Sequence, residues 1–194
     1  MNKEKNGIPS QEECFKLMAA YRMLPNIMAH SAQVMRVAVA IADNLRNGTG
    51  IDRRKVMAGA LLHDITKTRS IRTKERHDET GGMLLRELGF AEIGAIVEQH
   101  VYLRRINIQG PLEEREIVFY ADKRVMHDQI VSLDERLRDL VRRYGVTEEI
   151  SGRIMDNKGL VIEIERKISG FMKVDLQETI ENLRPGLLRL LSTA

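Results

Sequence analysis

The sequence contains few aromatic residues and almost no cysteine. Its 194 residues include four Phe, four Tyr, one Cys and no Trp, so that aromatic residues make up 4% of the chain. A core with so few aromatic side chains must be built from Leu, Ile, Val, Met and Ala, which favours packed helices over a β-sandwich or barrel. We therefore predict an all-α protein. The length suits one domain that buries most of its unfolded surface.

Features of secreted, membrane and nucleic-acid-binding proteins are also scarce. The single cysteine, Cys14, cannot form an intramolecular disulfide. The first ten residues, MNKEKNGIPS, lack the apolar core of a signal peptide, and no apolar run approaches the ~20 residues of a membrane span. The net charge of +3 is too small to indicate nucleic acid or membrane as a partner, although it suits a phosphorylated small molecule. We expect a cytoplasmic protein.

Apolar residues recur at helical spacing along most of the chain, and Pro, Gly and capping residues mark the ends of the helices. The expected helices cover residues 11–23, 27–46, 53–64, 77–88, 91–103, 112–127, 133–144 and 148–170, with a last one opened by Asp175 and interrupted at Pro185-Gly186. The polar, basic segment 66–76 has no helical period, and we interpret it as a loop. No internal repeat or long linker divides the chain, which predicts a single domain over residues 1–194.

Several ionisable residues occupy positions where a helix should present apolar side chains or should end. They are His30, His63, Asp64, His100 and Asp122, while His77 opens a helix after the basic segment. Buried polar groups are costly unless they are paired, and a divalent metal ion could accept lone pairs from all of them. The alternative for each histidine alone is a hydrogen-bonded core residue or, for His77, a solvated one. His127 is expected on another face and is left out of the site.

The order and setting of these residues resemble a known family. His30, then His63-Asp64 within LLHDITK, then Asp122 within FYADKRV, is similar to the H…HD…D pattern of the HD-domain superfamily of metal-dependent phosphohydrolases. The similarity covers about residues 27–127, and a helical extension follows from about residue 130 to 194. It implies that His30, His63, Asp64 and Asp122 ligate one metal ion. His77 and His100 lie where the binuclear subset has ligands for a second ion, which Asp64 would share.

The resemblance also implies a reaction. Two divalent ions would activate a water and neutralise charge on the phosphoryl oxygens. Asp64 and Lys67 are therefore the catalytic candidates, and Lys67, Arg69 and Arg104 are candidates for substrate binding, although solvated cations are the alternative for all three. Nitrogen and oxygen ligands without thiolate favour Fe or Mn, while Mg, Zn, Co and Ni are also compatible.

We therefore predict a phosphohydrolase that cleaves a phosphoester or phosphoanhydride bond in a nucleotide-type substrate. The alternative is a regulatory module that binds metal and nucleotide without turnover. An RNA-directed role is a third hypothesis, against which the modest charge and the lack of a basic, aromatic surface argue. The C-terminal helices could cover the pocket or form a homodimer interface, and the sequence does not choose between these two roles.

Overall fold

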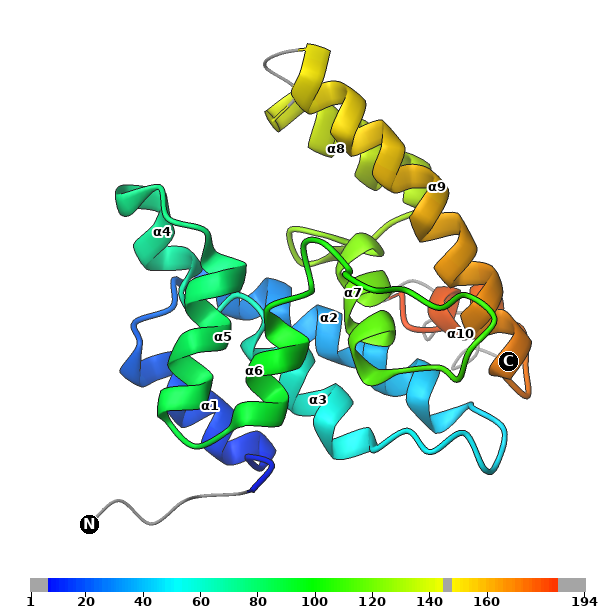
Figure 1. The fold of residues 1–194 in the computed structure, drawn as a ribbon, viewed down its shortest axis with the longest axis horizontal. Coiled ribbons are helices and arrows are strands. Elements are labelled where there is room, and N and C mark those ends of the chain that lie inside the picture. Colours follow the sequence, from blue (N-terminus) through cyan, green and yellow to red (C-terminus); the bar gives the residue numbers. More distant parts are fainter. Residues whose placement is uncertain (1–6, 145–147, 185–194) are drawn as a thin grey trace, which may run out of the picture.

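The computed structural model describes residues 7–144 and 148–184, and these residues are almost entirely helical (Figure 1). The helices are α1 (Gln11–Ala20), α2 (Pro25–Asp43), α3 (Arg53–Leu62), α4 (Lys67–Thr73), α5 (His77–Glu87), α6 (Ala91–Val97), α7 (Glu114–Lys123), α8 (Leu133–Tyr144), α9 (Glu148–Phe171) and α10 (Leu176–Glu181). One antiparallel pair of two-residue strands, β1 (Val125–Met126) and β2 (Gln129–Ile130), follows α7. The prediction of an all-α protein is confirmed.

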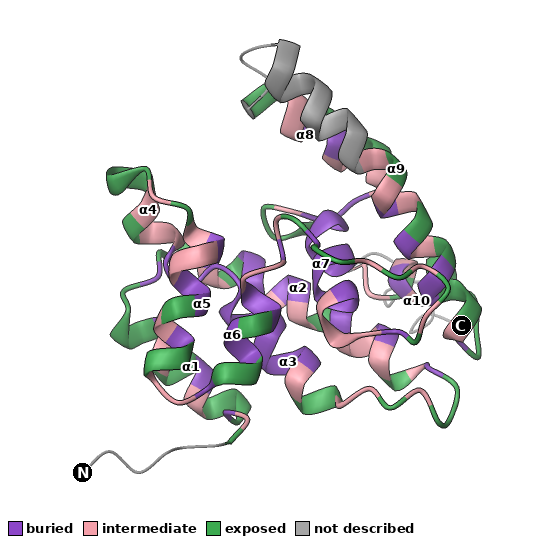
Figure 2. Ribbon diagram, in the orientation of Figure 1, coloured by how far each residue is buried: buried purple, intermediate pink, exposed green. Residues whose placement is uncertain are grey.

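The central layer consists of α2, α3 and α7, which pack against one another, with α6 beside α3 and α7. Their facing sides are the most continuously buried part of the ribbon in Figure 2. Aliphatic residues such as Val37, Leu61 and Val118 are fully buried there, as the aromatic-poor composition predicts. Burial of each such side chain contributes roughly 1.5–3 kcal/mol before the loss of conformational entropy is counted.

Local signals in the sequence explain where several helices begin. Ser10 and Glu13 form a reciprocal capping box at α1, and the carboxylate of Asp52 accepts from the backbone N–H of Arg54 at α3. Each of these side chains satisfies a backbone N–H that has no partner inside the helix. Asp175 caps α10 in the same way.

Two glycines bring α5 and α6 unusually close together. A Cβ atom built on Gly94 would lie 2.6 Å from the carbonyl oxygen of Gly82, and one on Gly82 would lie 2.9 Å from the carbonyl oxygen of Gly94. Side chains at these positions would force the helices apart, since such contacts are shorter than any normal van der Waals distance. The close packing matters because His77 begins α5 and His100 follows α6.

The helices α8 and α9 pack against each other and extend away from the body of the molecule as an arm (Figure 1). The base of the arm is joined to α7 by buried polar contacts. Lys167 in α9 donates to both carboxylate oxygens of Glu116 at 2.8 Å and to the backbone oxygen of Asn107 at 2.9 Å. In addition, Tyr120 donates to Glu165 of α9 at 2.6 Å.

Three expectations about local structure need correction. The interpretation of residues 66–76 as a loop is wrong, because residues 67–73 form α4. This helix buries none of its residues, so it leaves no apolar period in the sequence. The helix predicted over residues 112–127 ends at Lys123, because β1 and β2 follow, and the one predicted over residues 91–103 ends at Val97. The break predicted between the helices 133–144 and 148–170, and the interruption predicted at Pro185-Gly186, lie outside the described residues.

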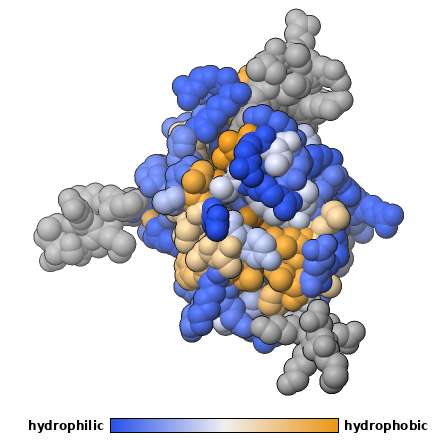
Figure 3. Space-filling model, turned by 90° about the vertical axis from the view of Figure 1, so that its left-hand side faces the viewer, coloured by the Kyte–Doolittle hydropathy of each residue, from blue (hydrophilic) through white to orange (hydrophobic). Residues whose placement is uncertain are grey.

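Among the described residues, no helix combines the length and the apolar character that crossing a membrane requires. Figure 3 shows the side of the molecule that carries α1, α4 and α5, where apolar surface lies between hydrophilic side chains. Exposed apolar residues in these elements include Phe15 in α1 and Met83 in α5.

Candidate metal centre

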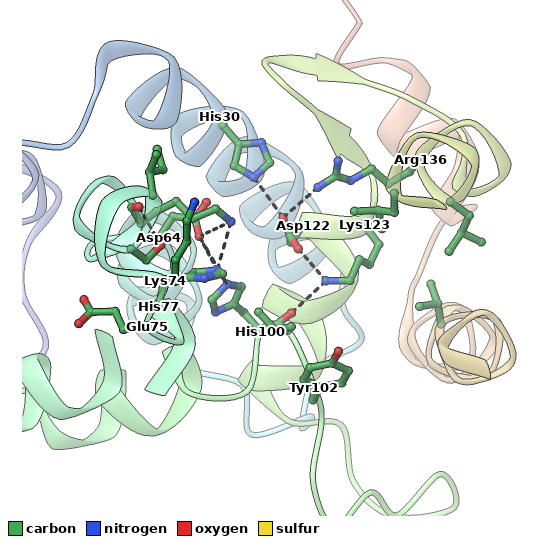
Figure 4. Close-up of a pocket in the computed structure, with 17 residues that line it drawn as sticks. His30, Asp64, Lys74, Glu75, His77, His100, Tyr102, Asp122, Lys123 and Arg136 are labelled. Atoms are coloured by element: carbon green, nitrogen blue, oxygen red, sulfur yellow. Dashed lines mark hydrogen bonds and ion pairs between the residues drawn. The ribbon is translucent and has the colours of Figure 1, made fainter. Parts of the chain in front are cut away.

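The structure brings the six candidate ligands together from five separate parts of the chain. His30 comes from α2, His63 and Asp64 from the end of α3, His77 from the start of α5, His100 from the turn after α6, and Asp122 from α7. Five of the six residues are classed as buried, and the side chain of His77 is 19% exposed. The fold therefore places all the predicted residues in one interior cluster, as Figure 4 shows for His30, Asp64, His77, His100 and Asp122.

His63 and His100 are oriented by the same local device. Each lies just past the end of a helix, and its Nδ1 atom bonds a backbone oxygen three residues earlier. The distances are 2.8 Å from His63 to Ala60 and 2.7 Å from His100 to Val97. Because a carbonyl oxygen can only accept, both Nδ1 atoms must carry hydrogen, and the Nε2 atoms of the neutral rings carry lone pairs.

His30 is oriented by a more distant part of the chain. Its Nδ1 atom lies 2.7 Å from the backbone oxygen of His127, in the turn between β1 and β2. His127 has a positive φ of 56°, a conformation uncommon for residues other than glycine. When the ring of His30 is neutral, the hydrogen on Nδ1 leaves the Nε2 lone pair facing Asp122, which is the arrangement found for metal-bound histidines whose other nitrogen is held by a hydrogen bond.

The first donor group surrounds His63. The nitrogen and oxygen ligand atoms of His30, His63 and Asp64 all lie within 4.8 Å of one another. Asp122 joins this group, since its Oδ1 atom is 3.1 Å from Nε2 of His30 and 3.8 Å from Nε2 of His63. These are the four residues that the H…HD…D pattern predicts for one ion.

The second donor group shares Asp64 with the first. The ligand atoms of Asp64, His77 and His100 also lie within 4.8 Å of one another. The Nε2 atom of His77 is 3.2 Å from Oδ1 of Asp64 and 3.2 Å from Nε2 of His100. Asp64 is thus the one residue common to both groups, and it lies where a bridging carboxylate would be needed.

Burial and neighbouring charges act in opposite directions on these groups. Burial lowers the pKa of His63 to about 3, so its ring is neutral. Burial also lowers the pKa of His30, but its hydrogen bond to Asp122, the charges of Asp122 and Asp64 and its contact with the backbone oxygen of His127 together outweigh burial and leave the pKa raised. For Asp64 and Asp122, burial favours the protonated form, yet nearby cationic and imidazole groups hold both pKa values well below the ordinary range. The carboxylates are ionised.

The donor set fits a divalent metal ion. The buried Nε2 atom of His63 has no hydrogen-bond partner within the described part of the chain. An unpaired buried acceptor is costly, and so is the convergence of several lone pairs on two carboxylates. A divalent cation coordinated by imidazole nitrogen and carboxylate oxygen would satisfy these groups together.

A cavity of about 610 Å³ opens next to the two donor groups. Its walls include cations, carboxylates and an apolar side; they are formed in part by Lys67, Lys74, Lys123 and Arg136, by Glu75, and by Ile71, Tyr102, Leu137, Leu140 and Val161. The volume lies within the ~300–1,000 Å³ that is usual for small-molecule sites. The ion-binding candidates therefore face a space large enough for an organic substrate.

The cationic residues predicted to bind substrate occupy different places. Lys67 lines the cavity, with its Nζ atom 3.5 Å from Oδ1 of Asp64 and 3.2 Å from Nε2 of His77. The structure does not bring Arg69 and Arg104 to the cavity wall. Both arginine side chains are about half exposed: Arg69 is paired with Glu75 of the cavity wall, and Arg104 lies 3.3 Å from Glu79.

Two residues of the site were not predicted from the sequence. Lys123 donates to Oδ2 of Asp122 at 2.6 Å and to the backbone oxygen of His100 at 3.0 Å, so it connects two candidate ligands. Arg136 reaches the cavity from α8. A signal for Arg136 exists, because it shares a helical face with Leu137 and Leu140, where a charged residue is unexpected.

Comparison with protein families decides the assignment. The model of the HD domain matches residues 27–126, which is more than half of the chain. This chain belongs to the HD domain family. The match confirms the resemblance inferred from the H…HD…D pattern, and the family's capacity to bind divalent metal agrees with the donor groups in the structure.

Two curated relatives are archaeal proteins named tRNA (cytidine(56)-2'-O)-methyltransferase. The one from Picrophilus torridus is 31% identical over 143 residues, covering 66% of this chain and 40% of the relative. The one from Thermoplasma volcanium is 35% identical over 95 residues, covering 48% of this chain and 26% of the relative. The chain thus spans less than half the length of these relatives. No solved structure matches it significantly.

Proposed function

We propose that this HD-domain protein is a metal-dependent phosphohydrolase acting on a nucleotide-type substrate. In this proposal His30, His63, Asp64 and Asp122 hold one divalent ion, and Asp64, His77 and His100 hold a second. Bound divalent ions lower the pKa of a coordinated water and neutralise charge on phosphoryl oxygens, which is the chemistry that phosphoester hydrolysis needs. The nitrogen and oxygen donor set favours Fe or Mn over the other divalent metals.

The orientation of the imidazole rings is the observation that carries the proposal. Three Nδ1 atoms donate to backbone oxygens, so that the Nε2 atoms of His30, His63 and His100 face the carboxylates of Asp64 and Asp122. In a structural hydrogen-bond network each buried polar atom would have a partner, whereas Nε2 of His63 has none among the described residues. Donor groups that share one carboxylate favour a binuclear arrangement.

The cavity indicates the kind of substrate. Its lining includes the cations Lys67, Lys74, Lys123 and Arg136 against the carboxylates of Asp64, Glu75 and Asp122. Divalent ions would add to the positive side of this balance, which favours a phosphorylated ligand. Lys67 lies beside both Asp64 and His77, and in the proposal it contacts a phosphoryl oxygen. The apolar side formed by Leu137, Leu140 and Val161 suits an organic group such as a nucleobase.

The names of the curated relatives favour a second candidate, in which the phosphoester belongs to the end of an RNA chain. An alignment that covers 66% of this chain must include part of residues 27–126, so the similarity involves the HD domain. The nucleotide substrate remains the first candidate, because the cavity is small and the chain carries a net charge of only +3.

Hydrolysis by the metal-loaded protein tests the proposal. The protein is freed of metal with chelator, loaded with Mn²⁺ or, without oxygen, Fe²⁺, and assayed with bis-p-nitrophenyl phosphate, p-nitrophenyl phosphate, a set of nucleotides and RNA with 2',3'-cyclic or 3'-phosphate ends. We expect turnover of at least one nucleotide that disappears in the Asp64→Ala variant. Tight nucleotide binding without turnover under every metal condition would contradict an enzymatic role.

A further inference from the structure

The guanidinium group of Arg136 is nearly buried and lacks sufficient partners. Its side chain is 13% exposed, and it makes one hydrogen bond among the described residues, from one terminal nitrogen to Oδ2 of Asp139 at 3.3 Å. Its Nε atom is buried without a hydrogen-bond partner in the same part of the structure. A guanidinium group offers five N–H donors, so most of its capacity remains unused.

The nearby carboxylates compensate this charge only in part. Asp139 also accepts from Arg142 at 3.1 Å and from Arg143 at 2.8 Å, so one carboxylate is shared by three guanidinium groups. The other candidate, Asp122, lies 3.9 Å away and already accepts a hydrogen bond from Lys123. A desolvated cation that is only partly paired is costly, so Arg136 keeps the capacity to bind a further anion.

The location of Arg136 shows where this anion would lie. Arg136 approaches Asp122 from α8, whereas Asp64 and Lys74 lie on the opposite side of the cluster (Figure 4). A terminal nitrogen of Arg136 is within 3.9 Å of a candidate metal ligand, so an anion that reaches it must adjoin the metal centre. The planar fork of a guanidinium group matches the oxygens of a phosphate.

We propose that Arg136 binds a second phosphate group of the substrate, next to the phosphoryl group held at the metal centre. The substrate is then a phosphoanhydride, such as a nucleoside diphosphate or a longer polyphosphate, rather than a simple phosphomonoester. This inference rests on the proposed function. It assigns a specificity-determining residue to α8, which lies beyond residues 27–126 that match the HD domain.

Binding of two stable phosphonates tests the role of Arg136 without requiring turnover. Methylenediphosphonate carries two phosphonate groups and methylphosphonate carries one, and calorimetry would measure their affinities for the Mn²⁺-loaded, dialysed protein. The Arg136→Gln variant removes the positive charge. The Arg136→Lys variant keeps the charge but loses the planar guanidinium group with its paired N–H donors. Arg142→Gln is the matched control, because Arg142 contacts the same Asp139 from the same helix with a side chain that is 79% exposed.

We expect the wild-type protein to bind the diphosphonate more tightly than the monophosphonate. Arg136→Gln should weaken diphosphonate binding by about 10- to 100-fold, the loss expected for hydrogen bonds to a charged group, and should change monophosphonate binding by less than about threefold. Arg136→Lys should give a smaller loss with the same selectivity. Arg142→Gln should match the wild type, and metal content should be unchanged in all three variants.

Other results would overturn the inference. An equal loss for both phosphonates would show a general charge effect, and a loss of bound metal in Arg136→Gln would show that Arg136 only supports Asp122. If the wild-type protein fails to bind methylenediphosphonate, a second phosphate site at Arg136 is excluded. If no substrate is hydrolysed but the Arg136-dependent selectivity is present, the proposed enzymatic function fails while the second phosphate site stands.

Discussion

The two faces of α7 carry buried polar groups that differ in how their hydrogen bonds are satisfied. On the side of α9, Glu116 accepts from Lys167, and Tyr120 donates to Glu165 and accepts from Arg124 at 2.7 Å. In this α7–α9 network, each of these donors is paired with an acceptor from the protein itself. On the side of the cavity, Asp122 belongs to a cluster in which imidazole lone pairs and carboxylates converge.

This difference distinguishes polar groups that satisfy one another from polar groups that could bind a ligand. Buried polar groups in a stable protein are normally satisfied by their neighbours. The α7–α9 network obeys this rule, whereas the cluster around His63 does not, since Nε2 of His63 is buried without a partner in the described chain. Degree of burial would not distinguish the two sites, because Glu116 and Asp122 are both buried.

The largest effect is expected at Asp64, which belongs to both donor groups. Asp64→Ala should remove nearly all bound metal and reduce hydrolysis below detection, because both ions lose a ligand. Elemental analysis and the phosphodiester assay measure these outcomes. His127→Asn is a suitable control, since Asn tolerates a positive φ and keeps the backbone oxygen that bonds His30. Retention of full metal content by Asp64→Ala would refute the assignment.

On the other face of α7, Lys167→Met should affect stability instead of metal binding. The substitution leaves the carboxylate of Glu116 buried without its cation, which typically costs about 3–5 kcal/mol in the free energy of unfolding. Urea denaturation measures the loss, and the double variant with Glu116→Leu should recover much of it. If the single variant loses metal while its stability is unchanged, the two faces do not differ as described.

Histidine variants divide the metal centre into its two donor groups. His77→Ala and His100→Ala should each lower the metal content from two ions per chain to one, because His30, His63, Asp64 and Asp122 remain. His30→Ala should instead reduce occupancy of the first group. Elemental analysis of the folded variants gives the number of metal ions per chain. The proposal of two ions is contradicted if the wild type holds one ion and neither His77→Ala nor His100→Ala changes this number.

The smallest predicted effect is a pH dependence of the metal-free protein. Folding lowers the pKa of His63 from 6.5 to about 3, so below pH 6.5 the unfolded chain gains a proton that the folded chain does not. The contribution of His63 to stability is therefore present above pH 6.5 and is lost as the pH falls toward 3, by up to about 1.4 kcal/mol per pH unit.

Urea unfolding in EDTA between pH 7 and pH 5 checks this sign. His63→Gln should show a shallower decrease than the wild type, and the opposite contribution of His30, whose folded pKa is raised, is present in both proteins. Identical slopes for the two proteins would contradict a buried neutral imidazole.

Much of the fold and of the ligand set could be predicted from the sequence, because both depend on local patterns. Capping residues such as Asp52 and apolar spacing mark the helices, and His30 and Asp122 were recognisable as polar residues on apolar stripes. The helix α4 was missed because it buries nothing. Arg136 was missed although it shares a helical face with Leu137 and Leu140, because its shortage of hydrogen-bond partners becomes visible only when its neighbours are known.

In the proposed metal centre, the carbonyl-bound imidazoles would also link folding to metal supply. Backbone contacts hold the rings of His30, His63 and His100 in place, so the folded chain would offer their Nε2 atoms to an ion together. A ligand that binds only the folded chain stabilises it in proportion to the logarithm of its free concentration. The melting temperature should therefore rise with added Mn²⁺ in the wild type and stay constant in Asp64→Ala, and in a cell the abundance of the folded protein would follow the available metal.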